Sequence, residues 1–267
     1  MNELLHGGMS AGEWDLLDAE YMADVLKASG NNFNLIEGFS PGYRTPRLTV
    51  QQIYPKLDAW IKAMRKHGIV TGIHMVNAND DTFKNYSMVD IKWLVEQLAR
   101  ETGTIGVLLC PVAEETGASE ERDFTEFCAR VWTAARGTLM FNGDGTTWSV
   151  PDARWKTVCY HTQSVGDMGP TKAEFHTIID TDSPIMKWLQ PGKLCDAGRV
   201  AEISGKASKA NKSFSLYIFN SLLVHWEALC AIARAYGKTP AAKMPKQKKE
   251  SIWDKFVAWL KGVLSGK

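Results

Sequence analysis

Two adjacent glutamates close one of the most apolar stretches of the chain. In the segment IGVLLCPVAEETG, Glu114 and Glu115 follow a run of apolar and small residues that is typical of a buried strand. Carboxylates are costly in a protein core and useful at its edge, so the pair predicts a strand that ends in a polar cleft. An acid in such a cleft can exchange protons with a substrate. Alternatively, one of the two begins the next helix, whose dipole favours negative charge in the first turn.

Polar residues follow other apolar runs in the same way. They are Glu37, His74, Asn77, Asn79, Asn142, Asp144, Tyr160, His161, Asp180, Asp182 and Asn220. Each also has an ordinary structural interpretation: a histidine can be a core residue bonded to backbone, and Asp180 and Asp182 can form a turn before Pro184. The prediction of a functional site therefore rests on the set and not on any one position.

The elements that position these residues form a repeated unit, in which a short apolar run precedes a longer amphipathic one. Apolar residues at helical spacing predict helices over residues 14–29, 49–67, 86–101 and 120–136, and a glycine follows each within two residues. Repetition of strand and helix requires parallel strands, which are buried on both faces and continuously apolar. An open doubly wound sheet and a closed eight-stranded barrel both fit this pattern.

The first six predicted strands support the barrel. They cover residues 3–8, 32–39, 69–76, 104–115, 138–145 and 156–163, with a weak helical stretch near 151–155 after the fifth. No GxGxxG or GxxxxGK[ST] motif follows the first strand, which disfavours the nucleotide-binding open sheets. We therefore predict an α/β protein with a (β/α)8 TIM barrel.

The last two units can be divided in two ways. In one, residues 174–183 form the seventh strand, 196–209 its helix, 213–219 the eighth strand and 222–236 the last helix. In the other, the segment GRVAEIS is the seventh strand and ends at Glu202. Because Val200, Ile203 and Ala207 fall at helical spacing, we favour the first division.

The composition changes after Gly237. A Pro- and Lys-rich linker is predicted over residues 238–250, after a barrel domain of residues 1–237. Residues 251–267 then place an apolar stripe opposite Lys255 and Lys261, which predicts an amphipathic helix. Such a helix packs on its own barrel, on a sister subunit or assembly partner, or on a membrane or virion surface.

Charge and cysteine content narrow the function classes. The formal net charge of +1 and the pI near 7.6 give no overall field for nucleic acid. The five cysteines are widely spaced with no CxxC pair, so we expect reduced thiols, no metal site and no cofactor. The N-terminal residues lack a signal-peptide pattern, which predicts synthesis in the cytoplasm, with association with a virion as a second expectation.

The set of strand-end residues resembles clan A glycoside hydrolases over about residues 3–237. The segment GIHMVNAND resembles that family's strand-three histidine segment, PVAEE its acid/base position and CYHTQ its strand-six segment. Segments such as YHTQSVGDMGP are also similar to barrel domains of phage tail and virion proteins. The chain departs from the clan A pattern where the Asn-Glu pair is replaced by Ala113-Glu114.

The resemblance implies a two-carboxylate mechanism. Glu114 would be the acid and Asp180, or Glu202 in the other division, the second carboxylate; a separation of about 5 Å implies retention and about 6.5–9.5 Å inversion. Residues expected to bind the carbohydrate are His74, Asn77, Glu115, Asn142, Tyr160, His161, Asp182 and Asn220. Aromatic residues expected near the same face are Trp148, Trp155, Tyr160 and Phe219.

Two functions follow from the sequence. The first is a glycan-cleaving barrel, and the second is a non-catalytic carbohydrate-binding or structural module on the same barrel, held in an assembly by its C-terminal helix. The missing asparagine before Glu114 favours the second, whereas the retained histidines favour the first. Metal-dependent hydrolysis through His74, His161 and Asp180 is a weaker third alternative, because the first strand has no HxH motif.

Overall fold

The computed structural model describes most of the barrel and the segment that follows it. The described residues are 5, 8–11, 14–39, 47–77, 82–113, 118–142, 153–161, 176–181, 196–218 and 225–247.

Eight parallel strands, each hydrogen-bonded to the next in sequence order, form a closed barrel because β8 also pairs with β1. They are β1 (Gly8–Ala11), β2 (Phe33–Glu37), β3 (Val70–Asn77), β4 (Val107–Ala113), β5 (Thr138–Phe141), β6 (Trp155–His161), β7 (His176–Thr181) and β8 (Ser213–Ile218). The (β/α)8 barrel predicted from the sequence is thereby confirmed, and the open sheet is excluded.

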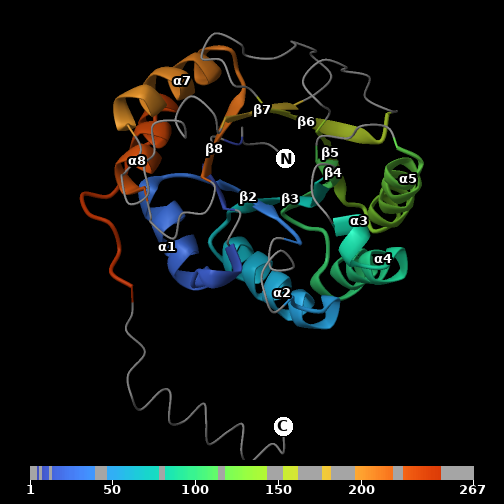
Figure 1. Ribbon diagram of the computed structural model, residues 1–267. Coiled ribbons are helices and arrows are strands. Elements are labelled where there is room, and N and C mark those ends of the chain that lie inside the picture. The colour runs from blue at the N-terminus through green and yellow to red at the C-terminus, as the bar shows by residue number, and fades with distance from the viewer. Residues whose placement is uncertain are drawn as a thin grey trace, which may run out of the picture.

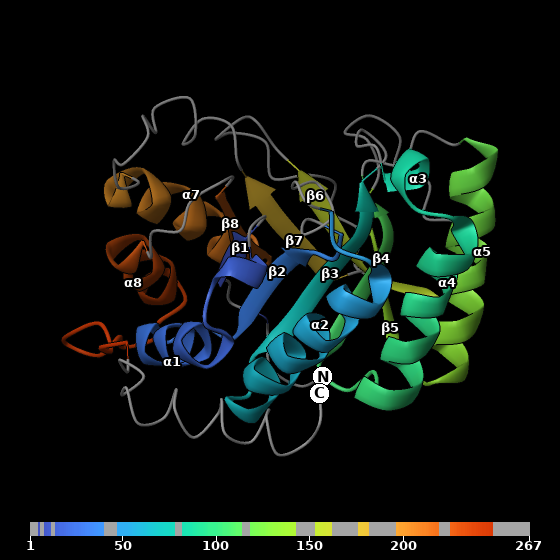
Figure 2. The same cartoon turned by 60° about the horizontal axis from the view of Figure 1, so that its bottom comes forward.

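Helices surround the barrel on its outside (Figure 1). They are α1 (Ala19–Ser29), α2 (Val50–Lys66), α3 (Thr82–Asn85), α4 (Met88–Gln97), α5 (Ser119–Ala134), α7 (Ala197–Lys209) and α8 (Trp226–Ala235), with a 3-10 helix at Trp14–Leu16 and a π-helical turn at Leu98–Thr102. Seen from the side, the long helices run back along the strands (Figure 2). The C-terminal ends of all eight strands therefore lie at the same end of the barrel.

Two hydrophobic layers hold these elements together. The larger one lies between strands and helices, where residues such as Ile73, Leu109 and Leu216 pack with the apolar stripes of the helices. The smaller one fills the interior of the barrel and contains Leu5, Phe33, Leu35, Leu108, Cys110, Met140, Cys159 and Ile178. In β4, Leu108 and Cys110 enter the inner layer and Val107 and Leu109 the outer one, as the two-residue period of a strand requires.

The helix boundaries follow local signals in the sequence. Asp18 caps α1 by accepting a hydrogen bond from the Tyr21 backbone N–H, and Gly30 ends it in the left-handed conformation at φ 87°. At the start of α2, the Gln52 side chain accepts from the Thr49 backbone N–H at 2.9 Å. The glycine that follows the first predicted helix therefore marks its end in the structure.

The predicted helix over residues 86–101 changes its hydrogen-bonding pattern in the structure. It corresponds to α4, which continues directly into the π-helical turn at Leu98–Thr102, whereas α3 lies before the predicted range. The guanidinium of Arg65, on α2, donates to the backbone oxygens of Thr102, Gly103 and Ile105 at 2.9–3.0 Å. The contacts to Thr102 and Gly103 satisfy carbonyl groups that the helix end leaves without partners.

Three other sequence-based expectations are resolved by the strands and α7. The first strand lies later than predicted, at Gly8–Ala11 instead of residues 3–8. The division that places the seventh strand near His176–Thr181 is confirmed, because β7 pairs with both β6 and β8. The other division is wrong, because GRVAEIS lies inside α7.

The segment after α8 is attached to the far end of the barrel. The Lys238 backbone N–H donates to Ala233 O at 2.9 Å, and that of Ala241 donates to Ala28 O at 2.8 Å. Ala28 lies in the last turn of α1, beside the N-terminal end of β2. The chain therefore passes the end of the barrel that carries the N-terminal strand ends, away from the C-terminal strand ends.

The predicted amphipathic helix over 251–267 lies outside the described residues. Within the part of the chain that is described, no helix has the length and apolar character needed to cross a membrane.

Candidate functional site

The interior of the barrel becomes polar at the C-terminal ends of β2 and β3. Glu37 ends β2 and is register partner of His74 on β3. Both side chains are buried, with 9% of Glu37 and 5% of His74 exposed. Ionisable groups at this burial need partners, and both residues have interaction partners within the structure.

Strand alternation explains why these two residues reach the interior. Phe33 and Leu35 on β2 belong to the inner apolar layer, and Glu37 is the next residue of the same parity. On β3 the corresponding positions are Gly72 and His74. A Cβ at Gly72 would lie 2.7 Å from Leu35 Cδ1, so the glycine leaves the interior to the side chains of β2.

Asn142 reaches His74 from the end of β5. Its Nδ2 lies 3.3 Å from His74 Nε2. The two residues come from strands on either side of β4. On β4, Cys110 is the register partner of His74 and belongs to the inner apolar layer. Asn142 is 1% exposed, and its Oδ1 has no hydrogen-bond partner in the described part of the chain. Such an unpaired buried oxygen costs about 1–3 kcal/mol.

Backbone contacts fix the strand ends that carry Glu37 and His74. The indole Nε1 of Trp14, which is fully buried, donates to Glu37 O at 2.7 Å. The Gly38 N–H donates to His74 O at 2.8 Å. Helical spacing predicted Trp14 as the start of a helix, and no local pattern predicts a hydrogen bond across 23 residues.

The ends of β6 and β7 bring together two further predicted residues. His161 is the last residue of β6 and the register partner of Asp180, which precedes the last residue of β7. Tyr160 precedes His161 on the same strand. Asn77 ends β3 beside Ala113, the last residue of β4. The backbone thus places these predicted site residues at one end of the barrel.

Several predicted site residues lie outside the described part of the chain. They are Glu114, Glu115, Asp182 and Asn220, together with Asn79, Asp144, Trp148 and Phe219.

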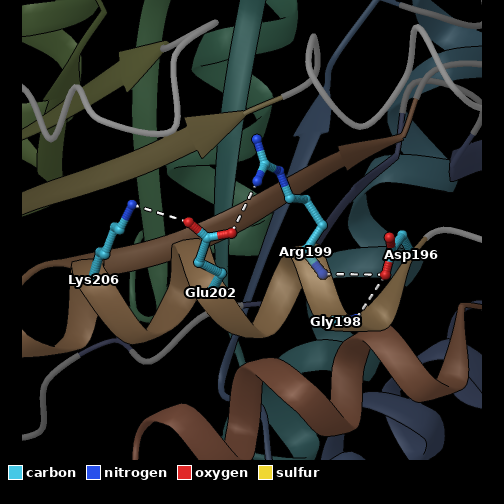
Figure 3. A network of polar contacts seen from close by, with 5 residues as sticks. All are labelled: Asp196, Gly198, Arg199, Glu202 and Lys206. Atoms are coloured by element: carbon cyan, nitrogen blue, oxygen red, sulfur yellow. Dashed lines mark hydrogen bonds and ion pairs between the residues drawn. The ribbon is translucent and has the colours of Figure 1, made fainter.

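Glu202 does not belong to this site. It lies on α7, where its carboxylate pairs with Arg199 at 2.9 Å and Lys206 at 3.1 Å, and 43% of its side chain is exposed (Figure 3). The hydrogen bond from Lys206 lowers the pKa of Glu202, and Arg199 adds to this effect. The alternative role as second carboxylate is therefore wrong, because helical spacing makes Glu202 part of an outer surface.

Trp155 also lies away from the strand ends. It is the first residue of β6 and not part of a helix, it is 1% exposed, and its ring packs edge-on against Phe141 at 5.7 Å. Trp155 belongs to the core between strands and helices. The expectation that it lies near the carbohydrate-binding face is therefore wrong.

The described residues contain no group of three His, Cys, Asp or Glu side chains that could hold a metal ion. Cys110, Cys128, Cys159 and Cys230 are buried free thiols. Burial raises the pKa of the Cys128 thiol well above its usual value, which disfavours the reactive thiolate.

The same architecture occurs in solved glycoside hydrolases. The endoglucanase Cel5A from Thermotoga maritima superposes with a TM-score of 0.60 at 13% identity, covering 86% of this chain and 98% of that one. A tri-modular GH5 (subfamily 4) endo-beta-1,4-glucanase from Bacillus licheniformis gives 0.60 at 11% identity, covering 89% and 60%. A glycoside hydrolase family 5 protein from Bacteroides vulgatus gives 0.57 at 12%, covering 83% and 64%.

These likenesses show that the chain shares the (β/α)8 barrel fold of those structures. The chain spans about 60% of the length of the tri-modular glucanase. No protein-family model matches the sequence, and the comparison with curated proteins found no match. None of the structures named here is a phage tail or virion protein, so that resemblance stays a prediction.

Proposed function

We propose that the protein binds a polysaccharide or another glycan at the C-terminal ends of its strands and cleaves it with two carboxylates. The observation that carries the proposal is the change of the barrel interior from apolar to polar at this end, where Glu37, His74 and Asn142 are buried. Polar groups converging at this face are what a (β/α)8 enzyme needs to orient a substrate. The likeness to GH5 barrels supports the glycan as its class.

In this proposal Glu114 and Asp180 share the chemistry. Glu114 directly follows the last residue of β4, and Asp180 lies near the end of β7, two strands beyond β5. Glu114 next to Glu115 would hold its proton more readily, since a neighbouring carboxylate disfavours ionisation, and it would protonate the leaving oxygen. Asp180 would face the oxocarbenium-like centre as an anion.

The remaining predicted residues would bind the sugar around this pair. His74, Asn77 and His161 come from the strand ends already described, and Tyr160 precedes His161. Glu115, Asp182 and Asn220 would extend the site from the connections that follow β4, β7 and β8. Asn142 completes the set through its contact with His74.

Turnover assays on defined oligosaccharides test the proposal. Structures of Thermotoga maritima Cel5A hold cellobiose and mannotriose, so cello- and manno-oligosaccharides are the first substrates to try. Glu114→Gln should lower the rate by about 10²–10⁴-fold, because the amide cannot donate the acid's proton. The matched control is Glu202→Gln, the same change on the outer surface of α7, which should leave the rate unchanged. Full activity in Glu114→Gln would contradict the assignment.

One observation favours a second function, a non-catalytic carbohydrate-binding or structural module. Ala113, buried at 2% exposure, stands before Glu114 where clan A enzymes have an asparagine. This function predicts oligosaccharide binding by calorimetry without product. It also predicts concentration-dependent association in sedimentation experiments that is lost when residues 251–267 are deleted. Product formation that depends on Glu114 would exclude it.

A further inference from the structure

The two ends of the strands carry opposite charge. The last two residues of each strand and the three residues after it include no Lys or Arg, but they include the carboxylates of Glu13, Glu37, Asp80, Glu114, Glu115, Asp144, Asp180 and Asp182. The first two residues of each strand and the three before it include Arg136, Arg154, Lys156 and Lys212 against Asp152 and Glu174. Because the whole chain has 31 Lys and Arg and 30 Asp and Glu, the excess of acid at the C-terminal strand ends is a local feature.

Helix capping explains other acids near this end of the barrel, but not those on the strands. Asp18 and Asp196 accept hydrogen bonds from backbone N–H groups in the first turns of α1 and α7. In contrast, Glu37 and Asp180 lie within β2 and β7, and Glu114 directly follows β4. The start of a helix therefore does not require their charge.

Buried polar groups at the same end provide a second observation. Glu37 is 9% exposed and follows Leu35 on the inner face of β2. Asn142 is 1% exposed; one end of its amide contacts His74, and its Oδ1 has no partner among the described residues. A buried amide end without a protein partner marks a place where a ligand group can bind. Carboxylates accept hydrogen bonds and do not donate them, so that ligand must bring N–H or O–H groups.

The apolar layer next to these carboxylates strengthens their effect. Leu35, Leu108 and Cys110 fill the adjoining interior, and charges beside such a low-dielectric region act more strongly than charges on an open surface. Lys and Arg occur only further along the connections, where Arg47 donates to Asn85 O at 3.4 Å. If Glu114 is protonated as the proposed acid, the strand ends still carry a negative excess. They should therefore attract a cationic ligand and repel an anionic one.

We propose that the candidate site takes a glycan whose sugar units carry protonated amino groups, in preference to neutral glycans, and that it rejects uronic-acid and sulfated glycans. The inference rests on the proposed function, which places a glycan at this end of the barrel, and it specifies the chemical class of that glycan. An ammonium group supplies both a positive charge and N–H donors to the carboxylates. A neutral sugar offers hydroxyl groups alone and binds less tightly.

The test compares three oligosaccharides that differ in one substituent. β-1,4-Linked oligomers of glucosamine, N-acetylglucosamine and glucose share ring and linkage, but carry an ammonium, an acetamide or a hydroxyl group at C2. Titration calorimetry on the full chain measures their affinities, at a pH where the amines are protonated and with a chelator to remove divalent cations. At low salt the glucosamine oligomer should bind at least about tenfold more tightly than the glucose oligomer, and salt should reduce this preference.

An oligouronate of the same length is the anionic member of the comparison and should not bind. Equal affinities for the three C2 variants, absence of binding by all of them, or tighter binding of the oligouronate would overturn the inference.

Single substitutions locate the preference on the molecule. Glu37→Gln keeps the shape of the side chain, removes one charge, and should reduce the preference for glucosamine over glucose by at least about threefold. Glu115→Gln makes the same change directly after the proposed acid and serves if Glu37→Gln does not fold. Glu202→Gln on the outer surface of α7 is the matched control and should leave the preference unchanged. If all three variants have equal effects, the preference reflects overall charge and the inference fails.

Binding and turnover fail separately. Equal binding of the neutral and cationic oligomers, with cleavage of the neutral one, would contradict this inference while supporting the proposed function. Tight binding of the glucosamine oligomer without product would contradict cleavage while supporting the inference. If oligolysine of matched charge binds as tightly as the glucosamine oligomer, charge alone is recognised and the assignment to a glycan is wrong.

Discussion

The two ends of the barrel interior differ sharply in chemistry although the same strands build both. Towards the N-terminal ends, Phe33, Leu35 and Leu108 pack with other apolar side chains. Towards the C-terminal ends, positions of the same parity carry Glu37 and His74, with Asn142 beside them. The backbone geometry is continuous from one end to the other, so the difference comes from side-chain identity alone.

This contrast indicates that one end of a strand contributes to stability and the other to ligand binding. The apolar end removes side chains from water and should supply folding stability, at roughly 1.5–3 kcal/mol for each large side chain buried. The polar end contains buried ionisable groups and an amide oxygen that has no partner among the described residues, and neither favours folding. Changes at the two ends should therefore have opposite effects on stability and on ligand binding.

Leu108→Ala should give the largest stability loss. Leu108 is fully buried in the inner apolar layer, and truncation leaves a cavity that typically costs 2–5 kcal/mol, here about 3. Denaturant unfolding measures the loss, and oligosaccharide binding at the polar end should stay unchanged in the folded variant. Asn142→Leu is the reciprocal variant, with weakened oligosaccharide binding and little loss of stability. If Leu108→Ala weakens binding as much as Asn142→Leu does, the two ends are coupled and the separation of their roles is wrong.

Gly72→Ala should destabilise the apolar end by overpacking. The added Cβ would lie 2.7 Å from Leu35 Cδ1 and 2.9 Å from Phe33 Cζ, and displacing them should cost about 1–3 kcal/mol. Gly205→Ala is the control, since nothing lies within 4 Å of a Cβ there in α7. It should raise the free energy of unfolding by about 0.5–1 kcal/mol, because alanine favours helix. Equal effects of the two substitutions would exclude packing as the cause.

A smaller effect should come from pH and His225. Burial lowers the pKa of His225 below its ordinary value of 6.5, so the folded protein binds its proton less readily than the unfolded chain. Stability is then complete above about pH 6.5 and falls as the pH decreases towards the lowered value. Unfolding curves between pH 8 and pH 5 should show a steeper decline for the wild type than for His225→Gln. Parallel declines would contradict the assignment to His225.

The smallest effect is expected for Glu202→Gln. Its ion pairs with Arg199 and Lys206 are exposed, and solvent screens such pairs strongly. The free energy of unfolding should change by an amount near the limit of measurement, and less still at high salt. A large loss of stability or turnover would return Glu202 to the candidate site.

Local patterns predicted the elements better than the contacts between them. Strand–helix repetition and the terminal glycines predicted the barrel, because each signal lies within a few residues of the element that it defines. The helical spacing of Val200, Ile203 and Ala207 correctly assigned α7. Trp155 was misplaced because a tryptophan in a short segment fits a helix or a strand equally well.

The site was predictable only as a set of strand ends. His74 and Glu37 were both expected at strand ends, but their pairing became known only from the register of β2 with β3. The hydrogen bond between Asn142 and His74 joins residues 68 apart in sequence and passes over β4. Its existence depends on barrel closure and on how far each side chain extends into the interior, which no sequence spacing specifies.

The path of the chain after α8 provides a point of attachment away from the candidate site. The Ala241 backbone is hydrogen-bonded to Ala28, beside the N-terminal strand ends. The chain therefore passes that point on the side away from the C-terminal strand ends. A bead, sensor surface or fused protein joined downstream would thus hold the barrel at the end opposite its C-terminal strand ends. Its polar mouth would face the solution, so an immobilised sample could be screened against large, insoluble polysaccharides that a tag at the strand ends would obstruct.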